Sequence, residues 1–181
     1  MAYTSSQVVQ AVPTGINSAL VRVGGGTLSG TSTVFSNVFS ATYDNYLITI
    51  NNFSLASAGG TAVNMQIGGE TSGYTVAQWY GNYASSGING LEYGSASTSS
   101  WRIGNPAGTA IDELSCVQIM LFNPFKTRRT VYQNLNTYAI GTLQIGTGTQ
   151  TSQSSFTAFT ILSAASTFND GVVNVYGYTN S

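Results

Sequence analysis

The sequence contains no histidine, a single cysteine and very few charged residues. Without histidine, a Ser-His-Asp or Cys-His catalytic site and a histidine-ligated metal site are excluded. One cysteine, Cys116, can form neither an intrachain disulfide nor a cysteine-based zinc site. Its apolar setting, SCVQIMLF, predicts a buried small hydrophobe. We therefore expect neither a metal nor a cofactor.

Charged residues make up 6% of the 181 residues, whereas an ordinary soluble domain has about 25%. The net charge of −1 gives little long-range repulsion between copies. The scarcity of cations argues against a nucleic-acid partner, because such binding depends on neutralising phosphates. Hydroxyl and amide side chains must cover the surface instead, which is common in β-rich proteins that work outside cells or in large assemblies.

Targeting and membrane segments are also missing. The N-terminal stretch MAYTSSQVVQAVPTG has neither a basic region nor an apolar region of the kind found in secretory signals. No stretch approaches the roughly 20 apolar residues that cross a bilayer. We therefore expect neither a signal peptide nor membrane insertion.

The carboxylates do not form a recognisable catalytic pair. A glycosidase needs two facing carboxylates, but Asp112 and Glu113 are adjacent and would point to opposite faces of a strand. The others lie mainly in turn-like contexts such as TYDNY, GGETSG and FNDG, where they are solvated or cap a turn. We therefore expect no enzymatic activity.

What the sequence does contain is alternation of apolar and polar residues with a period of two. In TAVNMQIGG, Val63, Met65 and Ile67 alternate with polar or small residues, which predicts half-buried strands. LSCVQIMLF is apolar on both faces and predicts a central strand that is covered on both sides. Many short strands separated by Gly, Asn and Ser predict an all-β sandwich or barrel. The candidate strands lie near residues 18–23, 33–39, 46–54, 61–68, 75–83, 99–103, 114–122, 129–135, 138–145, 156–162 and 171–178.

Residues 1–30 differ from the rest, since they lack aromatic residues after Tyr3 and end in VGGGTLSG. They suggest an N-terminal arm that serves as an anchor, with a hinge at Gly24, Gly25 and Gly26, followed by a compact domain over residues 31–181. The alternative is a first strand preceded by a loose tail.

Aromatic residues gather in QWYGNYASSGINGLEYG among small polar residues, a mixture that suits recognition of sugars or proteins. Strand alternation places half of such rings inside the sandwich, and we expect this for Trp79 and Trp101. Tyr80, Tyr83 and Tyr93 are candidate contacts with a glycan or partner, and Tyr83 and Tyr93 lie nearer predicted loops.

Three of the five cations, Lys126, Arg128 and Arg129, follow the corner Asn123-Pro124. Proline cannot donate to a sheet ladder, so the corner ends one strand and places the cations in a connection. Two interpretations remain open. The cations keep a sheet edge soluble, or they contact an acidic neighbour such as a capsid subunit or an anionic glycan.

Several stretches in order, ATYDNYLITI, SSWRIG, LFNPF, SSFTAFTI and VNVYGYTNS, resemble the small β-sandwich modules in virion structural proteins of tailed bacteriophages, notably marine and cyanobacterial ones. The resemblance covers residues 32–181. It implies an antiparallel, jelly-roll-like β-sandwich that is often a homotrimer, with no enzymatic activity and no cofactor.

The resemblance implies a virion protein that assembles in the host cytoplasm beside capsid or tail proteins. A capsid decoration or head-fibre component is expected first, because the chain has no room for a long shaft. A tail-fibre or tail-tip adhesin that binds a host cell-surface glycan is the alternative. A third hypothesis is a free carbohydrate-binding module using Trp79, Tyr80, Tyr83 and Tyr93.

Overall fold

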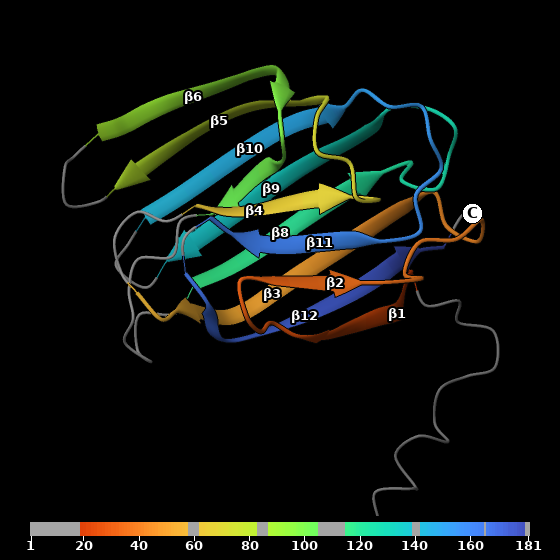
Figure 1. Cartoon of the computed structure of the whole chain (residues 1–181), viewed down its shortest axis with the longest axis horizontal. Coiled ribbons are helices and arrows are strands. Elements are labelled where there is room, and N and C mark those ends of the chain that lie inside the picture. Colours follow the sequence, from red (N-terminus) through yellow and green to blue (C-terminus); the bar gives the residue numbers. More distant parts are fainter. Residues whose placement is uncertain are drawn as a thin grey trace, which may run out of the picture.

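The computed structural model describes residues 19–57, 62–82, 87–104, 115–138, 142–164 and 166–179, of which residues 82, 87–97, 138 and 142 by backbone alone. All the regular secondary-structure elements within these ranges are strands, and they form two antiparallel sheets packed face to face (Figure 1). The predicted β-sandwich is confirmed. No helix in the described ranges is long and apolar enough to cross a membrane.

The large sheet has eight described strands, in the spatial order β1 (Leu20–Thr27), β12 (Phe168–Tyr178), β3 (Asn45–Leu55), β8 (Ser115–Phe122), β9 (Thr130–Tyr138), β10 (Thr142–Gln150), β5 (Tyr74–Asn82) and β6 (Gly87–Thr98). The small sheet has four described strands, in the order β2 (Ser32–Phe35), β11 (Phe159–Ser163), β4 (Val63–Ile67) and β7 (Trp101–Gly104).

Eight of these strands are arranged as a jelly roll. The chain passes between the sheets at each step from β1 to β5, and again at the steps β6–β7, β7–β8, β10–β11 and β11–β12. This interleaving gives the two Greek keys of a jelly roll. Strands β9, β10, β5 and β6, here called the extension, continue the large sheet beyond β8 (Figure 1). The fold is therefore a jelly roll with one sheet widened by two hairpins.

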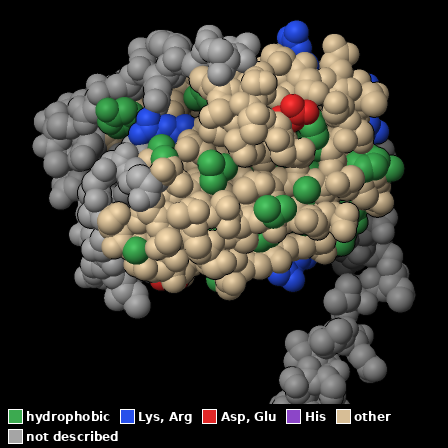
Figure 2. All heavy atoms as spheres, viewed as in Figure 1, with side chains coloured by type: hydrophobic (Ala, Val, Ile, Leu, Met, Phe, Trp, Pro, Cys, Tyr) green, Lys and Arg blue, Asp and Glu red, His purple; other side chains and the backbone are tan. Residues whose placement is uncertain are grey.

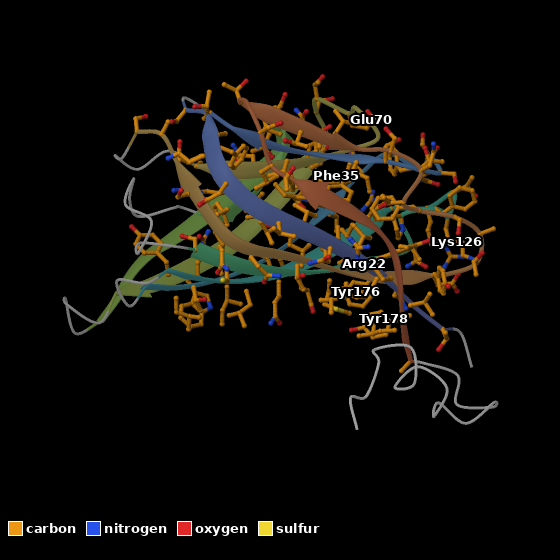
Figure 3. The ribbon with its side chains drawn as sticks, turned by 90° about the horizontal axis from the view of Figure 1, so that it is seen from below. Arg22, Phe35, Glu70, Lys126, Tyr176 and Tyr178 are labelled. Carbon is orange, nitrogen blue, oxygen red and sulfur yellow. The ribbon has the colours of Figure 1, made fainter. Side chains whose placement is uncertain are left out.

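The core lies between the two sheets, and strand alternation decides which side chains enter it. In β3, Tyr46, Ile48 and Ile50 are fully buried, as the pattern predicts. Aromatic rings fill much of the space. Phe35 stacks on Phe159 with ring centroids 4.9 Å apart, in the geometry that aromatic pairs prefer. Figure 3 shows Phe35 between the layers.

All eleven predicted strands overlap observed ones, but β6 was missed. Its sequence, GINGLEYGSAST, is rich in Gly, Ser and Thr and reads as a loop. Pairing with β5 along its length holds it as a strand. The prediction for 33–39 was too long, since β2 ends at Phe35 and Asn37 adopts a left-handed backbone with φ 56°.

The predicted hinge at Gly24, Gly25 and Gly26 is wrong. These residues lie inside β1, which pairs with β12 along its length and forms an edge of the large sheet. Backbone hydrogen bonding to β12 fixes the three glycines, so the compact fold starts before residue 31. The alternative of a first strand describes residues 20–27 correctly, and residues 1–18 of the expected arm lie outside the described residues.

Two further expectations need correction. Strand β8 is central but covered on one side only, because no described element covers its outer face, and Cys116 lies half-buried there rather than in the core. Asp170 belongs to β12, at a pair of bulges, rather than to a solvated turn. Its Oδ1 atom accepts hydrogen bonds from the backbone nitrogen and Oγ of Ser54, both at 2.9 Å. The carboxylate therefore satisfies a backbone N–H of β3 at a bulge, where the regular ladder of hydrogen bonds is interrupted.

Candidate functional site

The outer face of the large sheet carries the exposed apolar side chains that stand closest together. The small sheet covers the inner face of the jelly-roll strands, and no described element covers the outer face (Figures 1 and 3). Trp79, Leu135 and Ile145 point outward and are 36%, 40% and 38% exposed. An antiparallel sheet commonly has one face buried against the core and one polar face in solvent. Exposed apolar side chains that cluster on the solvent face therefore call for a functional explanation.

The strand register places these side chains in a row. Trp79 on β5 lies opposite Ile145 on β10, Ile145 lies opposite Leu135 on β9, and Leu135 lies opposite Gln118 on β8. Directly opposed side chains on one face stand about 4.5–5.5 Å apart between β-carbons. The row is therefore a continuous strip that starts on the extension and ends on the jelly-roll strands.

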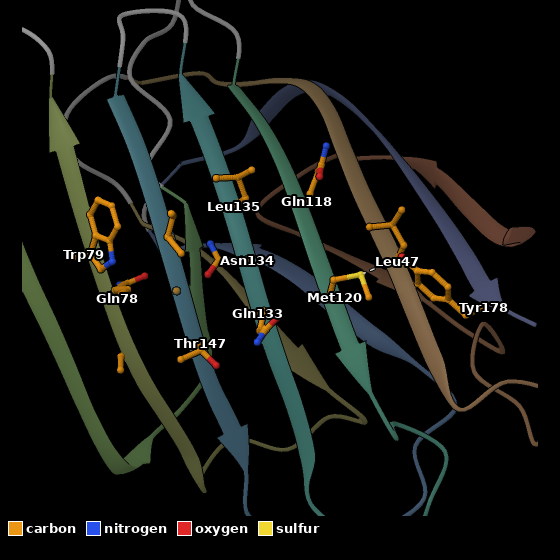
Figure 4. Close-up of a pocket in the computed structure, with 13 residues that line it drawn as sticks. Leu47, Gln78, Trp79, Gln118, Met120, Gln133, Asn134, Leu135, Thr147 and Tyr178 are labelled. Carbon is orange, nitrogen blue, oxygen red and sulfur yellow. Dashed lines mark hydrogen bonds between the residues drawn. The ribbon is translucent and has the colours of Figure 1, made fainter. Parts of the chain in front are cut away.

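A second row lies two residues along each strand. Thr147 lies opposite Gln133, Gln133 opposite Met120, and Met120 opposite Leu47. The phenol of Tyr178 donates a hydrogen bond to the sulfur of Met120 at 3.3 Å, which fixes the ring at the end of the row (Figure 4). The two rows together form the floor of one depression.

We call this depression the outer groove. It has a volume of about 760 Å³ and crosses strands β5, β10, β9, β8, β3 and β12. None of the residues that line it is charged. Its main outward side chains are Leu47, Trp79, Gln118, Met120, Gln133, Leu135, Ile145, Thr147 and Tyr178 (Figure 4).

Two amides supply hydrogen-bonding groups in the outer groove. Gln118 and Gln133 are both exposed, and neither side chain bonds to another group in the described part of the chain. Each amide offers two donors and one acceptor oxygen. The groove thus combines apolar contact area with neutral donors and acceptors, the usual make-up of a ligand site.

Beyond the groove, charge is scarce on the described surface. Arg22 lies at the β1 edge of the same face and donates a hydrogen bond to Asn174 at 3.1 Å (Figure 3). Figure 2 shows the side of the small sheet, where the backbone and uncharged polar side chains cover most of the coloured surface and few charged groups appear. Both faces of the sandwich therefore present mainly neutral groups.

The extension carries a second polar feature on its inner face. Gln78, Asn134, Asn136 and Gln144 are all at least 96% buried. Gln144 donates to Gln78, and Asn134 donates to the carbonyl of Ile103 in β7 at 3.0 Å. The side-chain oxygens of Asn134 and Asn136 accept no hydrogen bond from the part of the chain that the structure describes. Asn134 therefore ties the extension to β7, where a jelly roll alone would end.

The three cations between β8 and β9 differ in whether they form an ion pair. Lys126, Arg128 and Arg129 lie between β8 and β9, as predicted. Lys126 forms an ion pair with Asp44 at 2.7 Å, so it joins two connections of this chain. Arg128 and Arg129 are exposed and form no ion pair among the described residues. The connection does not line the outer groove.

The aromatic predictions divide between the two faces. Trp101 is fully buried and stacks on Tyr132 with centroids 4.6 Å apart, as expected. Trp79 points outward, so its predicted inward position is wrong. Tyr80 is 37% exposed at the end of β5 and does not line the outer groove. Tyr83 lies outside the described residues, and Tyr93 belongs to β6, where only the backbone is described.

Sequence reasoning missed the outer groove, although part of the signal was present. In YTVAQW, Trp79 is in phase with Thr75 and Ala77 and out of phase with Tyr74 and Val76. The apolar phase enters the core, so Trp79 must face outward. The meeting of Trp79 with Leu135 and Gln118 depends on strand order, which local pattern does not reveal.

One phenol in the core, that of Tyr74, has a shifted pKa. Burial raises the pKa of Tyr74 to about 12, while a hydrogen bond from the backbone nitrogen of Ile67 lowers it and the charge of Glu70 raises it. The Tyr74 hydroxyl donates to the carbonyl of Glu70 at 3.0 Å. Tyr74 therefore works as a neutral anchor of the β4–β5 connection.

The described residues hold no cluster of three or more His, Cys, Asp and Glu that could bind a metal ion. No protein-family model and no curated protein matches this chain. The fold and the outer groove therefore define its class, a jelly-roll β-sandwich with an open, uncharged groove on the outer face of the large sheet.

Proposed function

We propose that this protein is a non-enzymatic structural protein on the surface of a bacteriophage particle, either a capsid decoration protein or a head-fibre component. One observation supports the proposal most: the wide, uncharged outer face of the large sheet, with Trp79, Leu135 and Ile145 exposed. Interface cores are depleted of charge and enriched in aromatic residues and methionine. A face of this kind works by contact.

The low total charge supports the same function. With 6% charged residues, copies placed side by side in a particle repel each other little. The order of short motifs from ATYDNYLITI to VNVYGYTNS, similar to phage virion modules, gives the proposal its particle type. The expected partners are other copies, as a homotrimer, and capsid or tail proteins.

The alternative function is that of a tail-fibre or tail-tip adhesin, located on the tail of the particle instead of the head. It is favoured by the combination of Trp79 with the exposed amides of Gln118 and Gln133, since a host cell-surface glycan offers both C–H faces and hydroxyls. A free carbohydrate-binding module would use the same groups without a particle.

Quantitative mass spectrometry of purified phage particles from the source of the sequence tests the proposal. A copy number comparable to that of the major capsid protein supports decoration of the head. A few copies per particle supports the tail placement. Absence of the chain from particles, together with its presence in the soluble fraction, overturns the virion proposal.

A further inference from the structure

The outer groove lies where the extension meets the jelly roll. Trp79, Ile145 and Leu135 come from the extension, whereas Gln118, Met120 and Tyr178 come from the jelly-roll strands. The groove is therefore completed only by widening the sheet. Because no lining residue is charged, the groove offers nothing to neutralise a phosphate, a sulfate or a carboxylate, and an ionic ligand would lose hydration without compensation.

Two copies paired groove to groove through a two-fold axis would fit poorly. A two-fold interface places the same patch of each subunit against itself, so one depression of about 760 Å³ would face another. The two would enclose a void, whereas protein interfaces pack at the density of protein interiors. An occupant that fills the groove must be convex and narrow enough to lie in it.

The side chains specify the chemistry of that occupant. Trp79, Leu135 and Ile145 offer a flat apolar strip, and Gln118 and Gln133 stand beside it with free amide donors and acceptors. A ligand that satisfies both needs apolar C–H faces and uncharged hydroxyls within the same unit. Neutral sugars have this combination, and a lipid chain would leave the amides unpaired.

We propose that the outer groove binds an uncharged polysaccharide that lies across the strands, from Trp79 on β5 to Tyr178 on β12. Six strands spaced about 4.8 Å apart give a path of about 24 Å, which holds a short run of sugar units. The indole of Trp79 stacks on one sugar face, and Gln118 and Gln133 bond to hydroxyls. Tyr80 does not line this site.

Affinity gel electrophoresis of the full chain tests the proposal. The gels contain dextran, hydroxyethyl cellulose or galactomannan as neutral polymers, and carboxymethyl cellulose as the charged counterpart of the cellulose backbone. We expect retardation by at least one neutral polymer and weaker retardation by the anionic one. Trp79→Ala and Gln118→Ala should each weaken the apparent affinity about tenfold, as expected for central contacts.

Val172→Ala is the matched control, because Val172 is 45% exposed on the same face but does not line the groove. It should bind like the unmodified chain. Thermal unfolding of each variant shows whether it is folded, and Gln118→Ala removes an exposed amide without disturbing the core. Retardation by none of the neutral polymers, or equal retardation of all variants, overturns the proposal.

Size-exclusion chromatography with light scattering gives a further outcome. If the unmodified chain forms oligomers that Trp79→Ala and Gln118→Ala dissociate while sugar binding is absent, the groove is a protein interface and the proposal is wrong. This inference rests on the glycan-binding placement of the proposed function and specifies the class of sugar that the groove takes. Sugar binding is measured on the isolated chain, so it can fail while the protein is still found on particles, and the reverse.

Discussion

The two tryptophans show how position in a strand decides the role of a residue. Trp101 is fully buried, stacks on Tyr132 and meets the Tyr74 ring edge-on at 5.1 Å. Trp79 is 36% exposed on the opposite side of the large sheet. One indole builds the core and the other builds the outer groove, although the two residues are close in sequence.

Fluorescence quenching should separate these two indoles. Acrylamide should quench one component of the tryptophan emission readily and the other weakly, because only Trp79 can be reached from solvent. Trp79→Phe should remove the accessible component and leave the protected one. If Trp79→Phe leaves the quenching curve unchanged, the assigned exposure of the two indoles is wrong.

Tyr74 predicts a loss of stability at high pH. Its pKa rises from 10.0 to about 12 in the folded chain because the phenol is buried. Its contribution to the free energy of unfolding is complete below pH 10, where the Tyr74 phenol is protonated in both the folded and the unfolded chain. Between pH 10 and about 12 the unfolded chain releases this proton and the folded chain does not, so the free energy of unfolding falls.

Urea unfolding across that pH range measures the effect. Tyr74→Phe is less stable throughout, since Ile67 loses its bond to the phenol at 2.9 Å, but its stability should fall less steeply with pH. Parallel losses in the two proteins would show that Tyr74 is not the group responsible.

At the scale of elements, β1 illustrates how a flexible-looking segment becomes part of a sheet. Gly25 has φ 142° inside the strand, and a β-carbon there would overlap the carbonyl oxygen of Val173 in β12. Glycines in a hinge allow the backbone to move, whereas Gly25 lacks a β-carbon and so allows the backbones of β1 and β12 to approach closely.

Alanine substitutions distinguish a strand from a hinge. Gly25→Ala should lower the free energy of unfolding by about 1–3 kcal/mol, through backbone strain and displacement of β12. Gly26→Ala is the control, since its β-carbon would stand 3.5 Å from a ring carbon of Phe35, and should change stability by under about 1 kcal/mol. Chemical denaturation measures both, and equal tolerance would restore the hinge interpretation.

The connection between β8 and β9 makes a separate prediction. Lys126 pairs with Asp44, but both side chains are more than a third exposed, so water screens the attraction. Lys126→Ala should cost under about 1 kcal/mol, and the loss should shrink in high salt. Arg128→Ala, which removes an exposed cation without an ion pair in the described region, should cost less. A larger loss for Arg128→Ala in urea unfolding would contradict this assignment.

At the scale of the whole molecule, much of the fold could be predicted and the site could not. Alternation in β3 and β12 predicts which side chains enter the core, and the structure agrees for Ile48 and Val175. Strand β6 lacks that alternation and depends on its pairing with β5. The outer groove combines strands that are distant in sequence, such as β3, β5 and β10. Which side chains meet in it therefore depends on the strand order, which the sequence pattern does not reveal.

The strand order also explains why a jelly roll of this size has an exposed apolar strip. Two hairpins widen one sheet from four strands to eight while the other keeps four, within the described residues. Inside, buried amides such as Asn134 and Gln144 fill the added width. Outside, the added width completes the outer groove. A surface enlarged in this way is the one for which we propose a contact role on a particle.

Electron microscopy of intact particles with gold-tagged antibody against residues 31–181 tests the central claim most directly. The account predicts gold on the particle surface, spread over the head for a decoration or head-fibre protein. Gold confined to the tail would keep the particle assignment and replace the head placement with the adhesin. Particles without gold, from a preparation in which the antibody detects the free chain, would contradict the account.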